Sequence, residues 1–149
     1  MNTSLNDPKL KGVSFDLENR MMRVDLQDGR AILVPLCWYP RLDKAAQKDL
    51  AVWESIADEG IHWPTLDEDI SIEGILLGKT APIKQLKKEP LTPEKLQEFR
   101  TRLLGMSQKQ LAEALDYGLS TIQAFEHGTR EIKPRFETAF WALVSERVT

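Results

Sequence analysis

Ser120 and Gln123 carry hydrogen-bonding side chains near the start of a short segment with helical spacing, and Leu119 precedes them. Ile122 and Phe125 fall on the opposite side of this segment, so we expect them to be buried and to turn the other three side chains outward. An outward glutamine amide can pair with adenine through two hydrogen bonds, a serine hydroxyl can make one, and a leucine can touch only the methyl group of thymine. The spacing therefore predicts that Leu119, Ser120 and Gln123 contact base edges in a DNA major groove.

A second short helix must position this segment, and the sequence marks where that helix begins. Ser107 can cap the backbone N–H of Gln110 while the Gln110 side chain reaches back, and Met106 can pack against Leu111. Ala112 is small enough for another helix to cross closely over it. These signals predict two helices joined by a four-residue turn, a pairing that is typical of DNA-reading proteins.

Five further side chains are expected to contact phosphate groups instead of bases. Gln108 lies in the first turn of the first helix, where its side chain and a backbone N–H can hold a phosphate. The others supply a hydroxyl group or a positive charge near the same surface. They are Lys109, Thr121, Arg130 and Lys133.

Trp141 lies off the apolar stripe of the last helical segment. That stripe consists of Phe136, Ala139, Phe140, Leu143 and Val144. An off-stripe tryptophan is typical of a subunit interface, but it can equally form the edge of the domain core. We expect a homodimer, because two copies would place recognition helices ~34 Å apart in successive major grooves of a palindromic DNA site.

The segment from Leu91 to about Val144 resembles a lambda-repressor-like (Xre-type) helix-turn-helix domain. The residues that carry this resemblance are Ser107-Gln108, Leu111-Ala112, Leu115, Ser120-Thr121-Ile122, Phe125-Glu126, Gly128, Arg130 and Pro134. The chain has Asp116 where the family usually has glycine in the turn, and Gly118 where the family has a serine cap. Both changes are tolerable, because aspartate accepts positive φ and glycine is an acceptable cap. Leu119 also departs from the polar or basic residue that is frequent in the family.

The first half of the chain alternates apolar and polar residues, which predicts strands at 13–17, 22–26 and 31–36. Asp28-Gly29 is expected to supply the two positive-φ residues of a tight hairpin. Asp43 can cap a helix that ends at Gly60 and covers the sheet. A short strand at 61–63 and a helical turn at 71–77 follow.

The segment from Gly60 to Ser71, IHWPTLDEDIS after the glycine, resembles the signature of a small bacterial α+β family of unknown function. The likeness covers roughly residues 12–78, and members of this family sometimes carry a lambda-repressor-like domain behind it. Some relatives are encoded beside a small partner in arrangements suggestive of toxin–antitoxin pairs. The resemblance therefore implies an alternative, in which the N-terminal domain binds a small protein partner and the helical domain serves autoregulation.

Together these patterns predict an α+β N-terminal domain at 1–78, with a small antiparallel sheet and a covering helix, and an all-α helix-turn-helix domain at 91–149. Residues 79–90 form a basic segment between prolines, interpreted as a linker or as an arm that contacts DNA. Residues 1–80 carry nine Lys+Arg against fourteen Asp+Glu, a net charge of −5, and residues 81–149 carry eleven against nine, a net charge of +2. Only the second half is suited to face phosphate.

The remaining candidate residues favour structural roles. His62 with Asp67, Glu68 and Asp69 contains possible metal ligands, but consecutive carboxylates beside one histidine rarely converge on an ion. Cys37 has no cysteine partner in the chain and is expected to be buried. Three tryptophans are expected to anchor the core, namely Trp38, Trp53 and Trp63. We expect no catalysis, cofactor, metal or membrane partner, and a cytoplasmic location.

Overall fold

A computed structural model describes residues 8–148, and the chain divides into two compact units after Ala81. The boundary falls inside residues 79–90, the segment expected to be a linker. This segment is not a plain tether, because it contains the helical turn α4 (Ile83–Leu86), in which Leu86 is buried against the second unit. Each unit is described by itself below.

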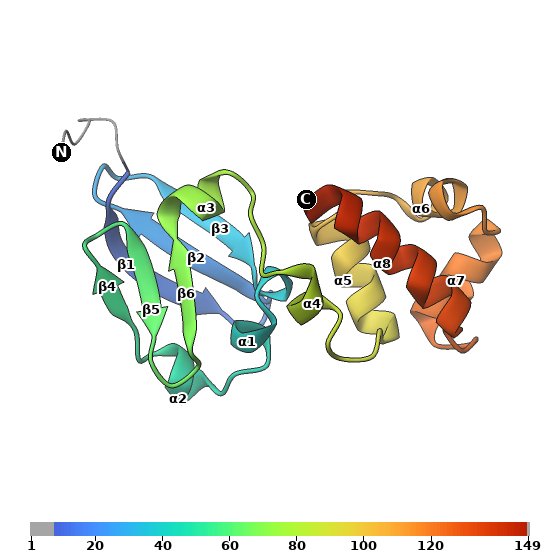
Figure 1. Ribbon diagram of the computed structural model, residues 1–149, viewed down its shortest axis with the longest axis horizontal. Helices are drawn as coiled ribbons and strands as arrows, with labels where there is room; N and C mark the ends of the chain where they lie inside the picture. Colours follow the sequence, from blue (N-terminus) through green and yellow to red (C-terminus); the bar gives the residue numbers. More distant parts are fainter. Residues whose placement is uncertain (1–7, 149) are drawn as a thin grey trace. The chain divides into compact units, whose positions relative to one another are not determined.

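The N-terminal unit contains two antiparallel sheets of three strands each, in the orders β1-β2-β3 and β4-β5-β6 (Figure 1). Its strands are β1 (Leu10–Asp16), β2 (Met21–Leu26), β3 (Ala31–Pro35), β4 (Glu54–Ile56), β5 (Gly60–Trp63) and β6 (Glu68–Ser71). Its helical turns are η1 (Leu36–Trp38), α1 (Pro40–Asp43), α2 (Gln47–Leu50) and α3 (Ile72–Leu76). The predicted α+β class is confirmed, with a second sheet in place of a covering helix.

The core of this unit lies between the two sheets. Met22 and Val24 of β2 are fully buried on one side, and Ile61 and Trp63 of β5 are fully buried on the other. The ring of Phe15 in β1 meets that of Trp63 edge to face, with centroids 6.4 Å apart. The Trp63 indole also donates a hydrogen bond to the backbone carbonyl of Leu50 at 3.1 Å. Of the three tryptophans expected in the core, Trp63 is fully buried, whereas Trp38 and Trp53 are half-buried. Cys37 is buried, as predicted.

The predicted hairpin between β2 and β3 forms, but its turn differs from the expected one. Only Gly29 has positive φ, at +92°, whereas Asp28 does not. Leu26 donates its backbone N–H to the carbonyl of Arg30 at 2.9 Å, which closes a three-residue loop. The Asp28 carboxylate accepts the backbone N–H of Arg30 at 3.0 Å, so it stabilises this longer loop from the side.

The helix predicted from Asp43 to Gly60 is wrong. The chain there forms two single turns, α1 and α2, followed by the edge strand β4. Asp43 binds Arg20 at 2.6 Å instead of capping a helix, and Ala57 and Asp58 both have positive φ in the turn between β4 and β5. The apolar spacing in this segment matched a helix by period alone, and pairing of β4 with β5 overrides it.

The end of this unit follows the prediction more closely. The strand expected at 61–63 is β5, and the helical turn after Ser71 is α3. The Ser71 hydroxyl accepts the backbone N–H of Gly74 at 2.9 Å, and Gly78 ends the turn with φ of +76°. The sequence did not reveal β6, whose Asp69 lies opposite His62 of β5 and pairs with it.

Glu68 provides a pH-dependent test of the packing between the sheets. Burial raises the pKa of its carboxyl group, and one carboxyl oxygen is buried without a hydrogen bond among the described residues. At low pH this carboxyl group is protonated in both the folded and the unfolded protein, so it has no effect on the free energy of unfolding. Once the pH rises above 4.5, the ordinary pKa of a glutamate, the group ionises more readily in the unfolded protein and so destabilises the fold. We expect Glu68→Gln to raise the free energy of unfolding at pH 7, and this gain to vanish below about pH 4. Urea unfolding at both pH values measures the difference; a gain that is equal at both would contradict this account.

The C-terminal unit contains helices joined by turns, and no strand occurs among its described residues. It contains α4, α5 (Pro93–Arg102), α6 (Gln108–Leu115), α7 (Leu119–His127) and α8 (Pro134–Val148). Its core contains four fully buried side chains, those of Leu96, Ile122, Phe136 and Phe140. The ring centroids of Phe125 and Phe136 are 4.8 Å apart. This aromatic core joins α7 to α8 and so fixes the inner face of α7.

Candidate nucleic-acid interface

The helix pair α6 and α7 begins with the capping arrangement that the sequence predicts. The Ser107 hydroxyl accepts the backbone N–H of Gln110 at 3.0 Å, and the Gln110 side chain accepts the backbone N–H of Ser107 at 2.8 Å. Two N–H groups at the start of α6 are therefore satisfied by side chains. Leu111 and Ala112 are buried at the crossing with α7.

The turn between the helices uses the two residues that depart from the family pattern. Asp116 adopts the left-handed conformation, with φ of 57° and ψ of 48°, and its backbone N–H bonds to the end of α6. Gly118 is the cap residue of α7, with φ of −70° and no side chain to contribute a hydrogen bond. Both conformations match the tolerance expected for aspartate and glycine at these positions.

One strip of side chains faces outward along α7. Ile122 and Phe125 are buried, so Leu119, Ser120 and Gln123 lie exposed on the other side of the helix. His127 continues this strip one turn beyond Gln123 and is also exposed. The first three residues were predicted from the sequence but His127 was not, although its spacing of four from Gln123 places it on the same side of the helix.

The residues expected at phosphates lie around this strip, but four of the five, all except Lys109, have a side-chain partner among the described residues. Arg130 donates to the Thr121 hydroxyl at 3.3 Å, which places both on one surface at the start of α7. Lys109 is exposed in the first turn of α6. Lys133 pairs with Glu131 at 3.3 Å, and both side chains are well exposed, so this pair is weak and salt-sensitive.

Gln108 has a different position from the one expected of a phosphate ligand. Its side-chain amide donates to the carboxylate of Glu126 at 3.1 Å and is half-buried. The amide therefore ties α6 to α7, and what remains for a phosphate is the backbone N–H at the start of α6, which has no partner within the helix.

A buried ion pair between α5 and α7 holds the two helices together. The Arg100 guanidinium donates two hydrogen bonds to Glu126, at 2.6 and 2.9 Å, and a third to the backbone carbonyl of Met106 at 2.9 Å. The two side chains are only 9% and 3% exposed. The pair, together with Gln108, links α5, the start of α6 and the end of α7. This arrangement fixes the orientation of the exposed strip from behind.

Sequence reasoning missed this network, although a signal was available. Arg100 follows Phe99 and stands within the apolar spacing of α5, where a charge is unexpected without a partner. Glu126 follows the buried Phe125 and has the opposite sign. Nothing local to either helix specifies that the two side chains meet, because they are 26 positions apart.

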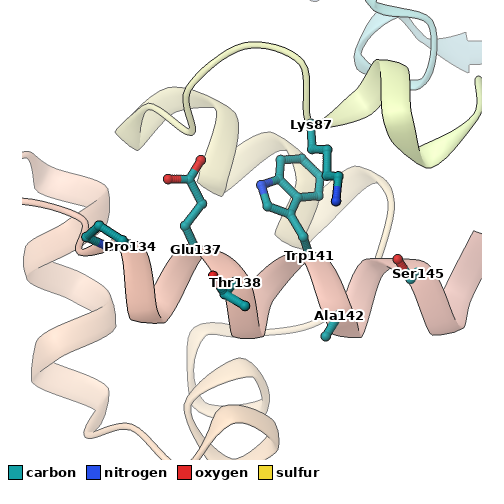
Figure 2. Close-up of a pocket in the computed structure, with 7 residues that line it drawn as sticks. All are labelled: Lys87, Pro134, Glu137, Thr138, Trp141, Ala142 and Ser145. Atoms are coloured by element: carbon teal, nitrogen blue, oxygen red, sulfur yellow. The ribbon is translucent and has the colours of Figure 1, made fainter.

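Trp141 lies inside the helical unit at its edge, with only 7% of its surface exposed. Its ring packs edge to face against Phe99 of α5, with centroids 5.3 Å apart. It also lines a cavity of about 410 Å³ along one side of α8, beside Lys87 and Glu137 (Figure 2). Of the two interpretations of this tryptophan, the contacts favour the edge of the domain core over an exposed interface residue.

Two other kinds of site, a metal centre and a membrane-spanning helix, are not found among the described residues. Among residues 8–148, no group of three or more histidine, cysteine, aspartate or glutamate side chains is arranged to hold a metal ion. None of the helices in this described part of the chain combines the length and apolar character needed to cross a bilayer.

Comparisons with known proteins divide the chain in the same way. Residues 11–81 match the family described as protein of unknown function (DUF2442), and residues 96–140 match the helix-turn-helix family. The chain is also similar to a solved protein of unknown function from Rhodospirillum rubrum, at 28% identity over 52% of this chain and 94% of that one, with a TM-score of 0.47. A comparison with curated proteins gave no match. The chain therefore contains a DUF2442 domain at residues 11–81, followed by a lambda-repressor-like helix-turn-helix domain at residues 96–140.

Proposed function

We propose that the protein is a sequence-specific transcriptional regulator of the Xre type that binds DNA as a homodimer. The observation that carries this proposal is the exposed strip of α7, whose orientation is set by the buried pair of Arg100 and Glu126. A helix-turn-helix domain supports DNA binding in general, and the strip supplies chemistry for reading sequence.

Base contacts in this proposal come from the first half of α7. The major groove of B-DNA is about 12 Å wide and admits one helix. Gln123 would pair with an adenine through its amide, and Ser120 would supply one adjustable hydrogen bond. His127 extends the strip, so it would meet a base or phosphate at the far end of the contact.

Contacts to phosphate groups on both sides of the base contacts would fix the position of α7 along the DNA. Lys109 and the backbone N–H of Gln108 lie at the start of α6, while Thr121 and Arg130 lie together beside α7. Lys133 would exchange its pairing with Glu131 for a phosphate. Since residues 81–149 carry a net charge of only +2, two copies binding together would give the affinity that one copy lacks.

Gln123→Ala should relax the preference at one base pair of each half-site. The lost pair of hydrogen bonds costs ~1–3 kcal/mol against the preferred base and little against the others. Binding titrations against a set of sites with single base changes, at fixed salt, measure this loss.

Arg130→Ala should weaken binding to every sequence alike and reduce the slope of log affinity against log salt by about one. It is therefore the matched control for Gln123→Ala. If both variants lose affinity uniformly across all sites, the division into base and phosphate contacts is wrong.

A second candidate function is a protein-binding module, such as an antitoxin whose N-terminal domain holds a partner and whose helix-turn-helix autoregulates. The observation that favours it is an apolar cavity of about 280 Å³ beside β1, an edge strand. Phe15, Leu17 and Trp53 line this cavity and are half-buried. An extended segment could pair with β1 and fill the cavity, and the charge of −5 on residues 1–80 favours a basic partner.

Pull-down of a partner by the full chain tests this second function. We expect Trp53→Glu to abolish capture, whereas Val52→Glu, at an exposed neighbour outside the cavity, should retain it. Equal capture by both variants would show that the cavity does not hold the partner.

A further inference from the structure

Leu119 differs in exposure from the other large apolar side chains of residues 82–148, which are buried or half-buried. It is the one large apolar side chain among residues 82–148 that is exposed, with 41% of its surface accessible. A single exposed leucine is ordinary on a protein surface. Its position is what distinguishes it, because it lies at the first position of α7, next to Ser120 and one turn from Gln123.

Leu119 is not part of the buried face of α7. Ile122 and Phe125 already supply the buried face of α7, and the ring of Phe125 contacts those of Tyr117 and Phe136. The preceding residue, Gly118, has an ordinary φ of −70°, and a Cβ atom there would come no closer than 3.8 Å to the Thr121 hydroxyl. The backbone conformation therefore does not require a glycine at position 118. Because Gly118 has no side chain, no side chain of the preceding residue lies beside Leu119.

The carbon atoms of a leucine side chain can neither donate nor accept a hydrogen bond. In the major groove, the C5 methyl group of thymine is the one apolar feature that a base pair presents. A 5-methylcytosine carries its methyl group at the same ring position. A leucine at the tip of a recognition helix can therefore distinguish bases only through such a methyl group.

We propose that Leu119 reads the C5 methyl group of a pyrimidine at one position of each half-site. This inference rests on the proposed function, since it assumes that α7 enters the major groove. It adds a specificity determinant that is apolar, beside the hydrogen bonds of Ser120 and Gln123.

The test uses the full-length protein and the site obtained by selection from random DNA, at one fixed salt concentration. Each thymine of the site is replaced in turn by deoxyuridine, which keeps base pairing and removes only the methyl group. We expect one position per half-site to lose affinity by about fourfold, the value of one buried methyl group. Where the selected pyrimidine is cytosine, 5-methylation should raise affinity by the same factor, which identifies methylcytosine as the source.

Leu119→Ala should remove this sensitivity, so that thymine and deoxyuridine bind equally at that position. Ser120→Ala is the control and should keep the fourfold difference. Because Leu119 is exposed, its replacement should leave the unfolding midpoint unchanged. A methyl effect that persists in Leu119→Ala, or none at any position, overturns the inference while DNA binding stands. Failure to select any site overturns the proposed function and the inference together.

Discussion

Glu126→Gln should lower the free energy of unfolding of the helical unit by about 3–5 kcal/mol. The variant keeps the shape of the side chain but removes the negative charge that Arg100 faces in a buried position. Removing one partner of such a pair leaves an uncompensated charge away from water, and this cost is larger than the net value of the pair itself. Hydrogen exchange of peptides from α7, followed by mass spectrometry, measures the change in this unit separately from the other.

Two further variants sharpen this test. Glu131→Gln breaks the exposed pair with Lys133 and should cost less than about 1 kcal/mol. Replacing both Arg100 and Glu126 with methionine removes both charges and should recover most of the loss. A cost for Glu126→Gln no greater than that for Glu131→Gln would contradict the role given to the buried pair.

DNA affinity should fall with Glu126→Gln even though Glu126 lies behind the exposed strip. The pair fixes α7 relative to α5, and the Gln108 amide joins the same carboxylate from α6. A loosened α7 must be ordered again on binding, which lowers the affinity for specific and altered sites together. The salt slope should stay unchanged, because no phosphate contact is removed.

Trp63→Ala should destabilise the N-terminal unit by about 3–5 kcal/mol. Trp63 is fully buried between the two sheets, and its removal leaves a cavity facing Phe15. The backbone carbonyl of Leu50 also loses the indole N–H that it accepts at 3.1 Å. Hydrogen exchange of peptides from β2 and β5 should report the loss, with α7 peptides as the internal reference.

Trp63→Phe separates the packing of this residue from its hydrogen bond. Phenylalanine retains most of the ring volume but cannot donate to Leu50, so we expect a loss of about 1–3 kcal/mol. Equal losses for the alanine and phenylalanine variants would show that the hydrogen bond, and not the filled space, holds the sheets together.

The helix-turn-helix could be predicted well because its signals are local. The cap formed by Ser107 and Gln110 is encoded within four residues, and the positive φ of Asp116 lies at the end of the same helix. The burial of Ile122 and Phe125 follows from helical spacing and fixes which side chains face outward. Leu119, Ser120 and Gln123 could therefore be selected from sequence alone.

The segment from Asp43 to Gly60 could not be predicted because partners far away in sequence decide its structure. Asp43 binds Arg20, 23 positions earlier, and β4 exists through its pairing with β5. The same reason applies to the buried pair of Arg100 and Glu126. Spacing within a helix shows which side is buried, but it does not show which charge lies across from it.

Selection from random oligonucleotides with the full-length protein, at one stated salt concentration, tests the central claim most directly. We predict enrichment of a palindromic sequence with half-sites about 10 base pairs apart from centre to centre, bound by two copies of the chain. Recovery of a pool without a preferred sequence, with affinity that depends on salt alone, would contradict the claim that the strip on α7 reads DNA.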